Sequence, residues 1–224
     1  MSGKLRIGSY NICHGAYAEL DMMKLCGVIK SAKLDIVGLQ EVDSKTTRSN
    51  GIDEPAEISL ASGLPYYVFV RSMDFKGGGY GNMILSRYPI SRFEIIPLDS
   101  GNAEPRSLGY AEINIDGFNM NFFNTHLSVE SEALRRSQIA FLEKKLKETG
   151  NYILTGDFNT ENFEELKAIG GSLVNNEERT YKTFPSESIA IDNIIYSREF
   201  RETDSGIITE SFSDHFMLWA ELDF

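Results

Sequence analysis

The feature that most constrains this chain is a repeated pattern in which a short apolar run stops at a small polar cluster. Short apolar runs of this kind are typical of buried strands. A strand is a rigid support, so polar groups at strand ends can be held at fixed separations around one substrate atom. The chain has only three histidines, and all of them fall inside or beside these clusters. The six clusters are Ser9-Tyr10-Asn11, Leu39-Gln40-Glu41-Val42-Asp43, Asn124-Thr125-His126-Leu127, Thr155-Gly156-Asp157-Phe158-Asn159, Ile191-Asp192-Asn193 and Ser213-Asp214-His215.

The segments between the clusters predict a fold that mixes strands and helices. Residues 21–33 carry Met22, Leu25 and Ile29 at helical spacing, and residues 128–148 have acidic residues early and lysines late, as a helix prefers. Shorter helices are expected near 56–62 and 162–169, and Asp116-Gly117 fits a two-residue hairpin turn. Because strands outnumber helices and hairpins alternate with crossover helices, we expect a sandwich of two sheets covered by helices. The expected strands span residues 5–10, 35–39, 66–70, 80–85, 90–98, 108–123, 152–154, 191–196, 205–209 and 215–223.

Composition limits the partners of the chain. Its 224 residues are 42% hydrophobic, without a linker or repeat, so we expect one domain over residues 1–224. The 22 basic and 33 acidic residues give a net charge of −11, which disfavours sequence-independent binding to nucleic acid. A carboxylate-rich site that recruits a divalent cation would still reverse its own local potential. Cys13 and Cys26 form neither a disulfide framework nor a CxxC pair.

Nothing in the chain predicts stable insertion into a membrane. The first residues lead straight into a strand without the apolar stretch of a secretory signal. A bilayer-spanning helix needs about 20 apolar residues, and no segment approaches that length. We therefore expect a cytoplasmic monomer, although a leader removed beforehand would leave no trace in this sequence.

Two of the clusters suggest acid-base or metal chemistry. Glu41 follows an apolar run without a lysine partner on the same strand, so its carboxylate is either solvated or holds a cation. Asp157 and Asn159 are two residues apart, and we expect Gly156 to let the backbone turn so that both side chains face one side. The alternative for this pair is an Asx turn that caps the following helix.

The last two clusters suggest a histidine with a carboxylate partner. Asp192 is flanked by isoleucines, and burying an aspartate is costly unless it is paired. His215 is its natural partner, because a carboxylate fixes the tautomer of an imidazole and supports its protonated form. A core hydrogen bond without a chemical role is the alternative for this pair, and the same alternative applies to His126.

The ligand types favour a hard cation. The chain lacks a Ser-His-Asp elbow, a phosphate-binding glycine loop and zinc-type spacing. Oxygen-rich ligands favour Mg²⁺ or Mn²⁺, and Mg²⁺ binds through one or two carboxylates together with substrate phosphate oxygens. The clusters therefore point to a phosphate ester as the substrate.

Taken in order, the motifs resemble those of the endonuclease/exonuclease/phosphatase superfamily across residues 5–224. The resemblance rests on Ser-Tyr-Asn-Ile, Leu-Gln-Glu-Val-Asp, Tyr-Gly-Asn-Met-Ile-Leu-Ser-Arg-Tyr-Pro-Ile, Asn-Thr-His-Leu, Thr-Gly-Asp-Phe-Asn, Ile-Asp-Asn-Ile and Ser-Asp-His. It implies a four-layer α/β sandwich, in which two mixed sheets pack face to face between helices. It also implies hydrolysis of phosphate esters by an enzyme that depends on Mg²⁺ or Mn²⁺.

The resemblance also implies roles for individual residues. Glu41 corresponds to the main metal carboxylate, Asn11 to an amide that places the metal and phosphate, and Asp214 to a further carboxylate of the metal site. Some members carry an acidic residue where this chain has Cys13, so we expect a single-ion site, with Cys13 as a soft ligand being the less favoured alternative.

The same resemblance assigns the reacting groups. Asp157 corresponds to the residue that orients or deprotonates the attacking water, and Asn159 to a phosphate contact. His126 corresponds to a group near the scissile bond. Asp192 and His215 correspond to a pair that contacts the phosphate and stabilises its developing charge.

Further substrate contacts are predicted at Arg106 and Arg48, outside these motifs, and at Asn82, which falls within one of them. Arg106 is the best candidate for a bidentate phosphate clamp. The glycines of residues 77–79 are expected in a hairpin turn, and the alternative is that this segment presents backbone amides to an anion. The acidic balance favours a small phosphoester or a phospholipid or inositol headgroup as substrate. One alternative is a nuclease that cleaves DNA or RNA, and another is a binding module that has lost the reaction, which only Cys13 favours.

Overall fold

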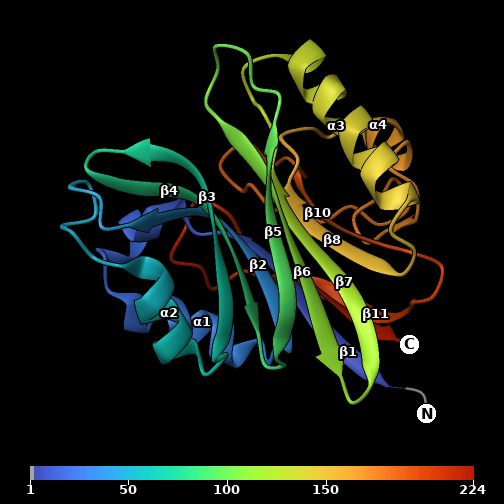
Figure 1. The fold of residues 1–224 in the computed structure, drawn as a ribbon, viewed down its shortest axis with the longest axis horizontal. Helices are drawn as coiled ribbons and strands as arrows, with labels where there is room; N and C mark the ends of the chain where they lie inside the picture. The colour runs from blue at the N-terminus through green and yellow to red at the C-terminus, as the bar shows by residue number, and fades with distance from the viewer. Residues whose placement is uncertain (1–2) are drawn as a thin grey trace.

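The computed structural model describes residues 3–224, which form two six-stranded mixed sheets packed face to face between helices (Figure 1). The first sheet contains, in spatial order, β11 (Arg201–Ile208), β12 (Met217–Asp223), β1 (Lys4–Asn11), β2 (Ile36–Ser44), β4 (Gly78–Ser86) and β3 (Tyr66–Phe75). The second contains β5 (Ile90–Leu98), β6 (Arg106–Ile115), β7 (Phe118–His126), β8 (Tyr152–Asp157), β10 (Asp192–Tyr196) and β9 (Ser172–Leu173). The predicted four-layer sandwich is confirmed.

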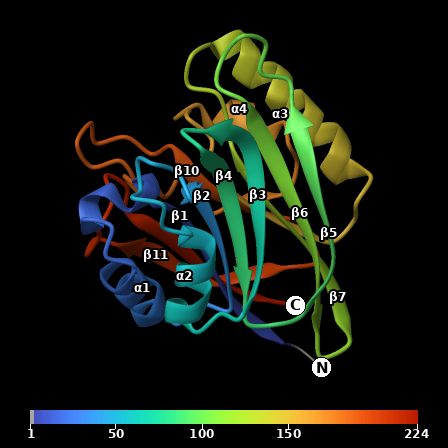
Figure 2. The same ribbon diagram turned by 60° about the vertical axis from the view of Figure 1, so that its left-hand side comes forward.

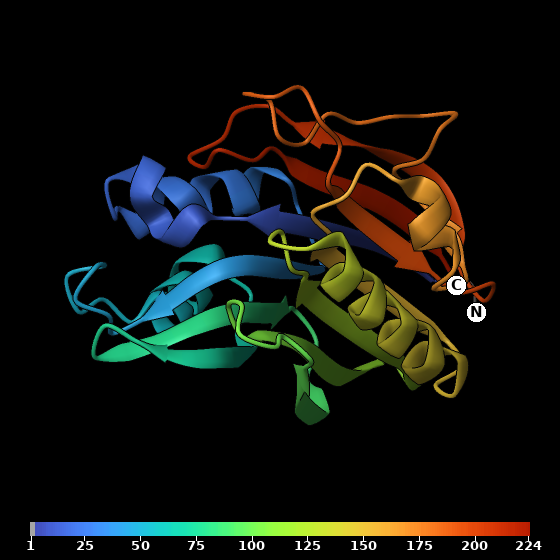
Figure 3. The ribbon, with the colours of Figure 1, turned by 90° about the horizontal axis from the view of Figure 1, so that it is seen from above.

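Two helix pairs cover the sheets on opposite sides (Figure 2). They are α1 (Met22–Ser31) with α2 (Glu54–Ser62), and α3 (Glu132–Lys147) with α4 (Phe163–Lys167). Seen from above, α3 lies along the strands of the second sheet (Figure 3).

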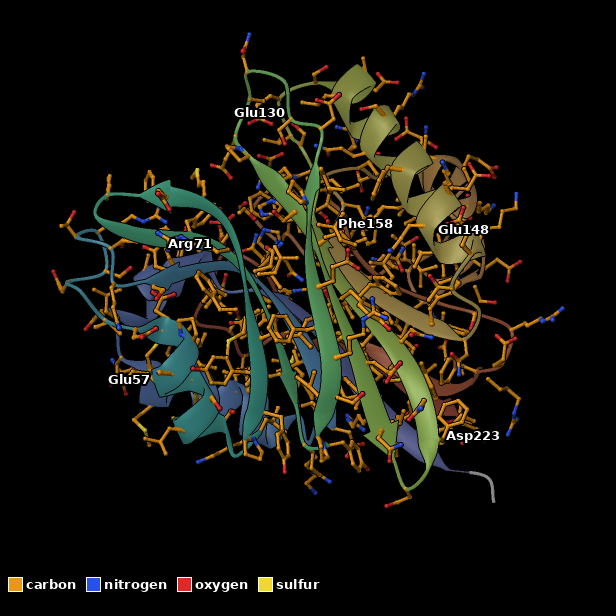
Figure 4. The ribbon with its side chains drawn as sticks, in the orientation of Figure 1. Glu57, Arg71, Glu130, Glu148, Phe158 and Asp223 are labelled. Carbon is orange, nitrogen blue, oxygen red and sulfur yellow. The ribbon has the colours of Figure 1, made fainter. Side chains whose placement is uncertain are left out.

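Three apolar cores separate the four layers. Ile58 of α2 packs in the core against the first sheet, and Ile7 and Phe122 pack in the core between the sheets. Leu142 of α3 and Phe158 are fully buried in the core against the second sheet, where Figure 4 labels Phe158.

Local sequence signals set the helix starts. Asp21 caps α1 by accepting from the backbone N–H groups of Met23 and Lys24, and Ser131 caps α3 by accepting from Leu134. Because a cap residue leaves helical geometry, α3 starts at Glu132 rather than at residue 128 as predicted. The hairpin turn at Asp116-Gly117 is confirmed, with φ of 50° and 94° that suit a type I′ turn. The six-residue 3-10 segment η1 (Cys13–Ala18), which follows β1, was not predicted.

The topology directs two sets of strand ends toward the same region. β1 and β2 are parallel and joined through α1, and β7 and β8 are parallel and joined through α3. The carboxyl ends of parallel neighbours meet at one edge, so Asn11 lies beside Gln40, and His126 lies beside Asp157. β10 runs antiparallel to β8, which places its first residue, Asp192, on the other side of Asp157.

A buried amide network joins the two sheets. Asn124 of β7 donates to the backbone carbonyls of Leu39 and Met83 at 2.8 and 3.0 Å. Its oxygen accepts from Gln40 Nε2 at 2.7 Å and from Thr155 Oγ1 at 3.1 Å. The side chains of Asn124, Gln40 and Thr155 are fully buried, and these four hydrogen bonds tie the two sheets together just below the strand ends.

Glycine is required at position 156 for a different reason from the one predicted. It lies within β8 without a positive φ, so it does not turn the backbone. A Cβ there would lie 2.7 Å from the carbonyl oxygen of Thr125 on the neighbouring strand. Glycine is therefore required by close backbone approach. Among residues 3–224, no helix combines the length and apolar character that a membrane crossing requires.

Candidate active site

Three adjacent strands of the second sheet present one row of ionisable side chains. His126 ends β7, Asp157 ends β8 and Asp192 begins β10, with Asp157 paired to both neighbours in the strand register. All three side chains are buried. The row is an outcome of the strand order, because these residues are far apart in the sequence.

Glu41 faces this row from the first sheet because of a β-bulge. The register between β2 and β4 shifts between Leu39 and Val42, and Glu41 adopts a φ of 57°. A bulge adds one residue to a strand and redirects a side chain. Asn11 then links the two sheets, since its Nδ2 donates to Glu41 Oε1 at 3.0 Å and to Asp157 Oδ2 at 3.1 Å.

Asp157 Oδ2 is the point on which the donors converge. His126 Nε2 lies 3.6 Å and His215 Nε2 3.7 Å from this oxygen. The other oxygen, Oδ1, accepts from the backbone N–H of Asn159 at 3.0 Å, so the Asx turn weighed as an alternative is present as well. Burial and the charge of Asp192 raise the pKa of Asp157 to about 7. A carboxylate with this pKa can take up a proton near neutral pH.

His126 is held as a neutral donor. Arg106 Nη1 lies 2.9 Å from His126 Nδ1, and arginine can only donate, so Nδ1 accepts and the ring proton is on Nε2. Burial and the nearby Arg106 charge lower the pKa of His126 to about 3. The Nε2–H therefore points toward Asp157 without carrying a positive charge.

His215 has the opposite charge state. Its Nδ1 lies 2.8 Å from Asp192 Oδ2, so the predicted pairing of these two residues is confirmed. Burial disfavours the charged ring, but Asp192 and Asp157 outweigh it and raise the pKa of His215 to about 10. The ring of Phe184 packs against His215 at 4.9 Å between centroids. The site thus places an imidazolium and a neutral imidazole around one buried carboxylate.

Glu41 stays ionised. Burial opposes its charge, but the nearby His14 imidazole, the His126 ring and the Asn11 amide outweigh it and lower the pKa of Glu41 to about 2. Glu41 lines the same cavity as Asp157 and Asp214, and an ionised carboxylate is a ligand that a divalent cation accepts.

These groups surround one cavity of about 410 Å³, a size typical of small-molecule sites. Two arginines line it, and both are paired with carboxylates. Arg48 bonds to buried Asp43 through Nε at 3.0 Å and Nη2 at 2.8 Å, and Arg106 Nη1 lies 2.8 Å from Glu104. The Arg106 Nε is buried without a hydrogen-bond partner among residues 3–224.

Most of the predicted site residues line this cavity. Those that do are Glu41, Arg48, Arg106, His126, Asp157, Asn159, Asp214 and His215. Asn11 and Asp192 are buried behind it, where they hold Glu41, Asp157 and His215. Asn82 is buried in β4 and donates to the backbone oxygen of Ser107 at 3.3 Å, so the structure does not bring it to the cavity.

Several lining residues were missed by sequence reasoning. Tyr80, Glu104, Phe184 and Glu187 contribute to the cavity wall. Tyr80 and Glu104 adjoin motifs that had drawn attention, which was the available signal. Phe184 and Glu187 lie on the segment between β9 and β10, where no sequence pattern distinguished them.

Two groups of side chains within residues 3–224 bring ligand atoms within 4.8 Å of one another, as a metal site requires. One is Asp157 with Asp192 and His215, where His215 Nδ1 is already bonded to Asp192. The other is Glu41 with Cys13 and His14. The ionised Glu41 carboxylate, and Asp192 Oδ1, which has no hydrogen-bond partner among residues 3–224, are oxygen donors of the kind that a divalent cation takes.

Comparison with known proteins identifies relatives of this chain by sequence and by fold. An uncharacterized protein of Escherichia coli K12, YbhP, is 31% identical over 154 residues, which are 61% of this chain and 58% of YbhP. The chain thus spans little more than half of this relative.

Solved structures align over almost the whole chain. A family member from Bacteroides thetaiotaomicron aligns with a TM-score of 0.80 and 22% identity, covering 100% of this chain and 96% of the other. The mannosyl-6-phosphatase of the same organism has a TM-score of 0.76 and 21% identity, covering 98% and 100%. TDP2 of Caenorhabditis elegans has a TM-score of 0.76 and 21% identity, covering 98% and 97%. At these identities the likeness establishes the fold alone. Residues 8–215 match the sequence profile of the Endonuclease/Exonuclease/phosphatase family, and the chain belongs to that family.

Proposed function

We propose that this protein is a divalent-metal-dependent hydrolase of small phosphate esters. The proposal rests on the convergence of Glu41, His126, Asp157 and His215 on one cavity. Each of these side chains has a distinct charge state there. Asp157 is the base, His215 is protonated and His126 is neutral. This set is what in-line attack of water on a phosphate ester requires.

The chain's own residues supply most of the proposed chemistry. Asp157 Oδ2 accepts the proton of the attacking water, with its carboxylate fixed by Asn11 and by the Asn159 N–H. His215, held by Asp192, donates from Nε2 to a phosphate oxygen as charge develops there. His126 donates from its neutral Nε2–H to a second oxygen.

A divalent ion held by Glu41, with Asp214 and Asn11 nearby, would polarise the phosphate and neutralise its charge. Arg106 lines the cavity and would contact the phosphate outside the ion. The sequence favours Mg²⁺ or Mn²⁺ for this ion.

The cavity favours a compact substrate. A volume of about 410 Å³ suits a phosphorylated small molecule. The charge of −11 and the pairing of both cavity arginines leave little positive charge with which to grip a polyanion. The related fold of mannosyl-6-phosphatase supports a phosphorylated sugar or similar headgroup.

Cleavage of nucleic acid is the second candidate. The fold is also that of Danio rerio TDP2, whose structure is a complex with a single-stranded DNA product, with a TM-score of 0.75. Salt dependence separates the candidates, because a nuclease loses binding as salt rises. Efficient nicking of plasmid at physiological salt would favour this candidate over small esters.

The direct test measures hydrolysis of sugar phosphates, inositol phosphates, phospholipid headgroups, nucleotides and DNA with Mg²⁺ or Mn²⁺. Glu41→Gln and Asp157→Asn should each lower kcat/KM at least about 100-fold, as expected for loss of a positioned acid-base or metal group. Glu57→Gln is the matched control, since Glu57 is exposed on α2 (Figure 4) and does not line the cavity. Near-normal turnover by either active-site variant would refute the proposal.

A further inference from the structure

The junction of β2, its following loop and α2 contains a buried carboxyl group that the proposed chemistry does not use. Glu54, the first residue of α2, is fully buried. Its Oε2 accepts from the backbone N–H of Asp43 at 2.8 Å, and its Oε1 has no hydrogen-bond partner among residues 3–224. The two cations of the loop, Lys45 and Arg48, pair with Asp53 and Asp43 instead. The cations of its own loop thus leave the Glu54 carboxyl group unpaired.

Asp43, by contrast, is the centre of this loop. Its buried carboxylate accepts from the hydroxyl groups of Thr46 and Ser49, both at 2.6 Å. It also accepts from Arg48 through Nε at 3.0 Å and Nη2 at 2.8 Å. Burial opposes the charge of Asp43, but these hydrogen bonds outweigh it and lower its pKa. An ionised Asp43 therefore holds Arg48, which lines the cavity with 26% of its side chain exposed.

Aromatic rings support Arg48 as well. The guanidinium carbon lies 4.6 Å from the ring centroid of Phe75 and 5.3 Å from that of Tyr80. The guanidinium thus has two supports, the rings of β3 and β4 and the carboxylate of Asp43. Glu54 contacts the second support through the Asp43 backbone.

Glu54 is mostly uncharged at neutral pH. A carboxylate without a cationic partner is costly to bury, and like charges nearby add to that cost. Burial raises the pKa of Glu54 most, the hydrogen bond from Asp43 opposes this and the Asp43 charge reinforces it, and the resulting pKa is about 8. Ser49 and Arg48 also face the group and lower its pKa. On the side of η1, burial raises the pKa of the Cys13 thiol to about 12, so this group stays neutral.

We propose that Glu54 is a positioning residue that, as an uncharged carboxyl group, holds Asp43 and through it Arg48 in place to bind the phosphate of the substrate. Ionisation of Glu54 adds a negative charge that repels Asp43 and competes for Arg48. Phosphate affinity therefore falls on the alkaline side of neutral pH. The inference rests on the proposed function, because it assigns Arg48 to phosphate binding in the same cavity.

Binding of inorganic phosphate reports the position of Arg48 without turnover. Phosphate is titrated calorimetrically into the full chain with Mg²⁺ present. Glu54→Gln keeps an acceptor for the Asp43 N–H but cannot ionise, so at about pH 7 it should bind phosphate as the wild type does. At about pH 9 the wild type should bind at least about fivefold more weakly than this variant, the lower end of the range for coupled sites. Comparison at equal pH removes the ionisation of phosphate and of the other cavity groups.

A double-mutant cycle shows whether Glu54 acts through Arg48. Glu54→Leu removes the acceptor and should raise the phosphate Kd about fivefold to tenfold at neutral pH, as loss of one hydrogen bond of ordinary strength predicts. In an Arg48→Gln background the same change should have no effect on the Kd. Equal effects in both backgrounds would show a merely structural role and overturn the proposal, as would equal phosphate binding by the wild type and Glu54→Gln at both pH values.

The same helix supplies a matched control. Glu57 is also on α2 but is exposed, and it does not line the cavity. Glu57→Gln should keep both the phosphate affinity of the wild type and its fall at alkaline pH. A loss of this fall in Glu57→Gln would contradict the assignment to Glu54.

Urea denaturation of the metal-free chain tests the charge of Glu54 separately. Because folding raises its pKa above 4.5, the contribution of Glu54 to the free energy of unfolding is complete below about pH 4.5 and is lost as the pH rises through about 8. The stability of Glu54→Gln relative to the wild type should therefore increase between about pH 5 and about pH 9. A difference that stays constant over this range would show that Glu54 is ionised throughout, and the proposal would fail.

The outcomes also separate this inference from the proposed function. Phosphate binding that depends on Glu54, without hydrolysis of any ester, keeps the positioning role and removes the hydrolase. Hydrolysis together with a phosphate affinity that does not depend on Glu54 keeps the hydrolase and removes the positioning role.

Discussion

The pairing of Asp192 with His215 gives the most informative perturbation, Asp192→Asn. The carboxylate accepts from His215 Nδ1 at 2.8 Å, and His215 is only 4% exposed, so solvent does little to screen the pair. The rise in pKa from 6.5 to about 10 corresponds to roughly 5 kcal/mol in favour of the protonated ring, at about 1.4 kcal/mol per unit. Asparagine keeps the shape but removes the charge, while the burial that opposes protonation remains.

We therefore expect the pKa of His215 in Asp192→Asn to fall well below about 10, since only the charges of Asp157 and Asp214 then oppose the effect of burial, and the ring loses most of its charge near neutral pH. The pKa of Asp157 should fall too, because the charge of Asp192 helps to raise it. Loss of the imidazolium should lower kcat about 10²- to 10⁴-fold at neutral pH. The alkaline limb of the pH–rate profile should move to lower pH.

The pH dependence of the free energy of unfolding gives an independent test of the His215 charge. Because folding raises the pKa of His215, its contribution to the free energy of unfolding is complete below about pH 6.5 and disappears as the pH rises through about 10. Asp192→Asn should remove this dependence.

Imidazole NMR of the metal-free protein measures the change directly, since the chain has only three histidines. In the wild type, one ring should titrate near pH 10, while the pKa of His126 stays near 3. An unchanged His215 pKa in Asp192→Asn would show that the charge state of the ring has another origin, and the reasoning would fail.

Three further changes test the supporting structure. Asn124→Leu should lower the free energy of unfolding by at least about 3 kcal/mol in urea denaturation, since each buried polar group left without a partner costs about 1–3 kcal/mol; a smaller loss would mean that the amide network does not fix the sheets. Gly156→Ala should lower the free energy of unfolding by about 1–3 kcal/mol, because the new Cβ would lie 2.7 Å from the carbonyl oxygen of Thr125. A variant as stable as the wild type would refute the close-approach argument. Asp43→Asn should raise KM at least about tenfold with a smaller change in kcat, because Asp43 positions Arg48 for substrate binding. Charge-assisted hydrogen bonds of about 1.5–3 kcal/mol hold this arginine. A change in kcat alone would contradict the positioning role of Asp43.

Local rules predicted much of the secondary structure and the pairing of Asp192 with His215. The hairpin at Asp116-Gly117 follows from turn chemistry, and the strands follow from apolar periodicity. The helix at residues 128–148 was predicted too long because capping by Ser131 depends on a backbone geometry that composition does not report. Gly156 was correctly singled out as a backbone constraint but for the wrong reason, since its contact is with another strand.

The order of residues along the chain was enough to identify the polar clusters, to place them at strand ends and, through the order of the motifs, to indicate the family. The tertiary structure decided the charge of each group and its neighbours. His126 is neutral because Arg106, from a different strand, bonds to its Nδ1, and His215 is charged because Asp192 lies beside it. Cys13, His14 and Glu41 come close to one another only where β1 and β2 lie side by side. A pKa and a ligand set depend on distances through space between residues far apart in the chain, and those distances exist only once the two sheets have packed.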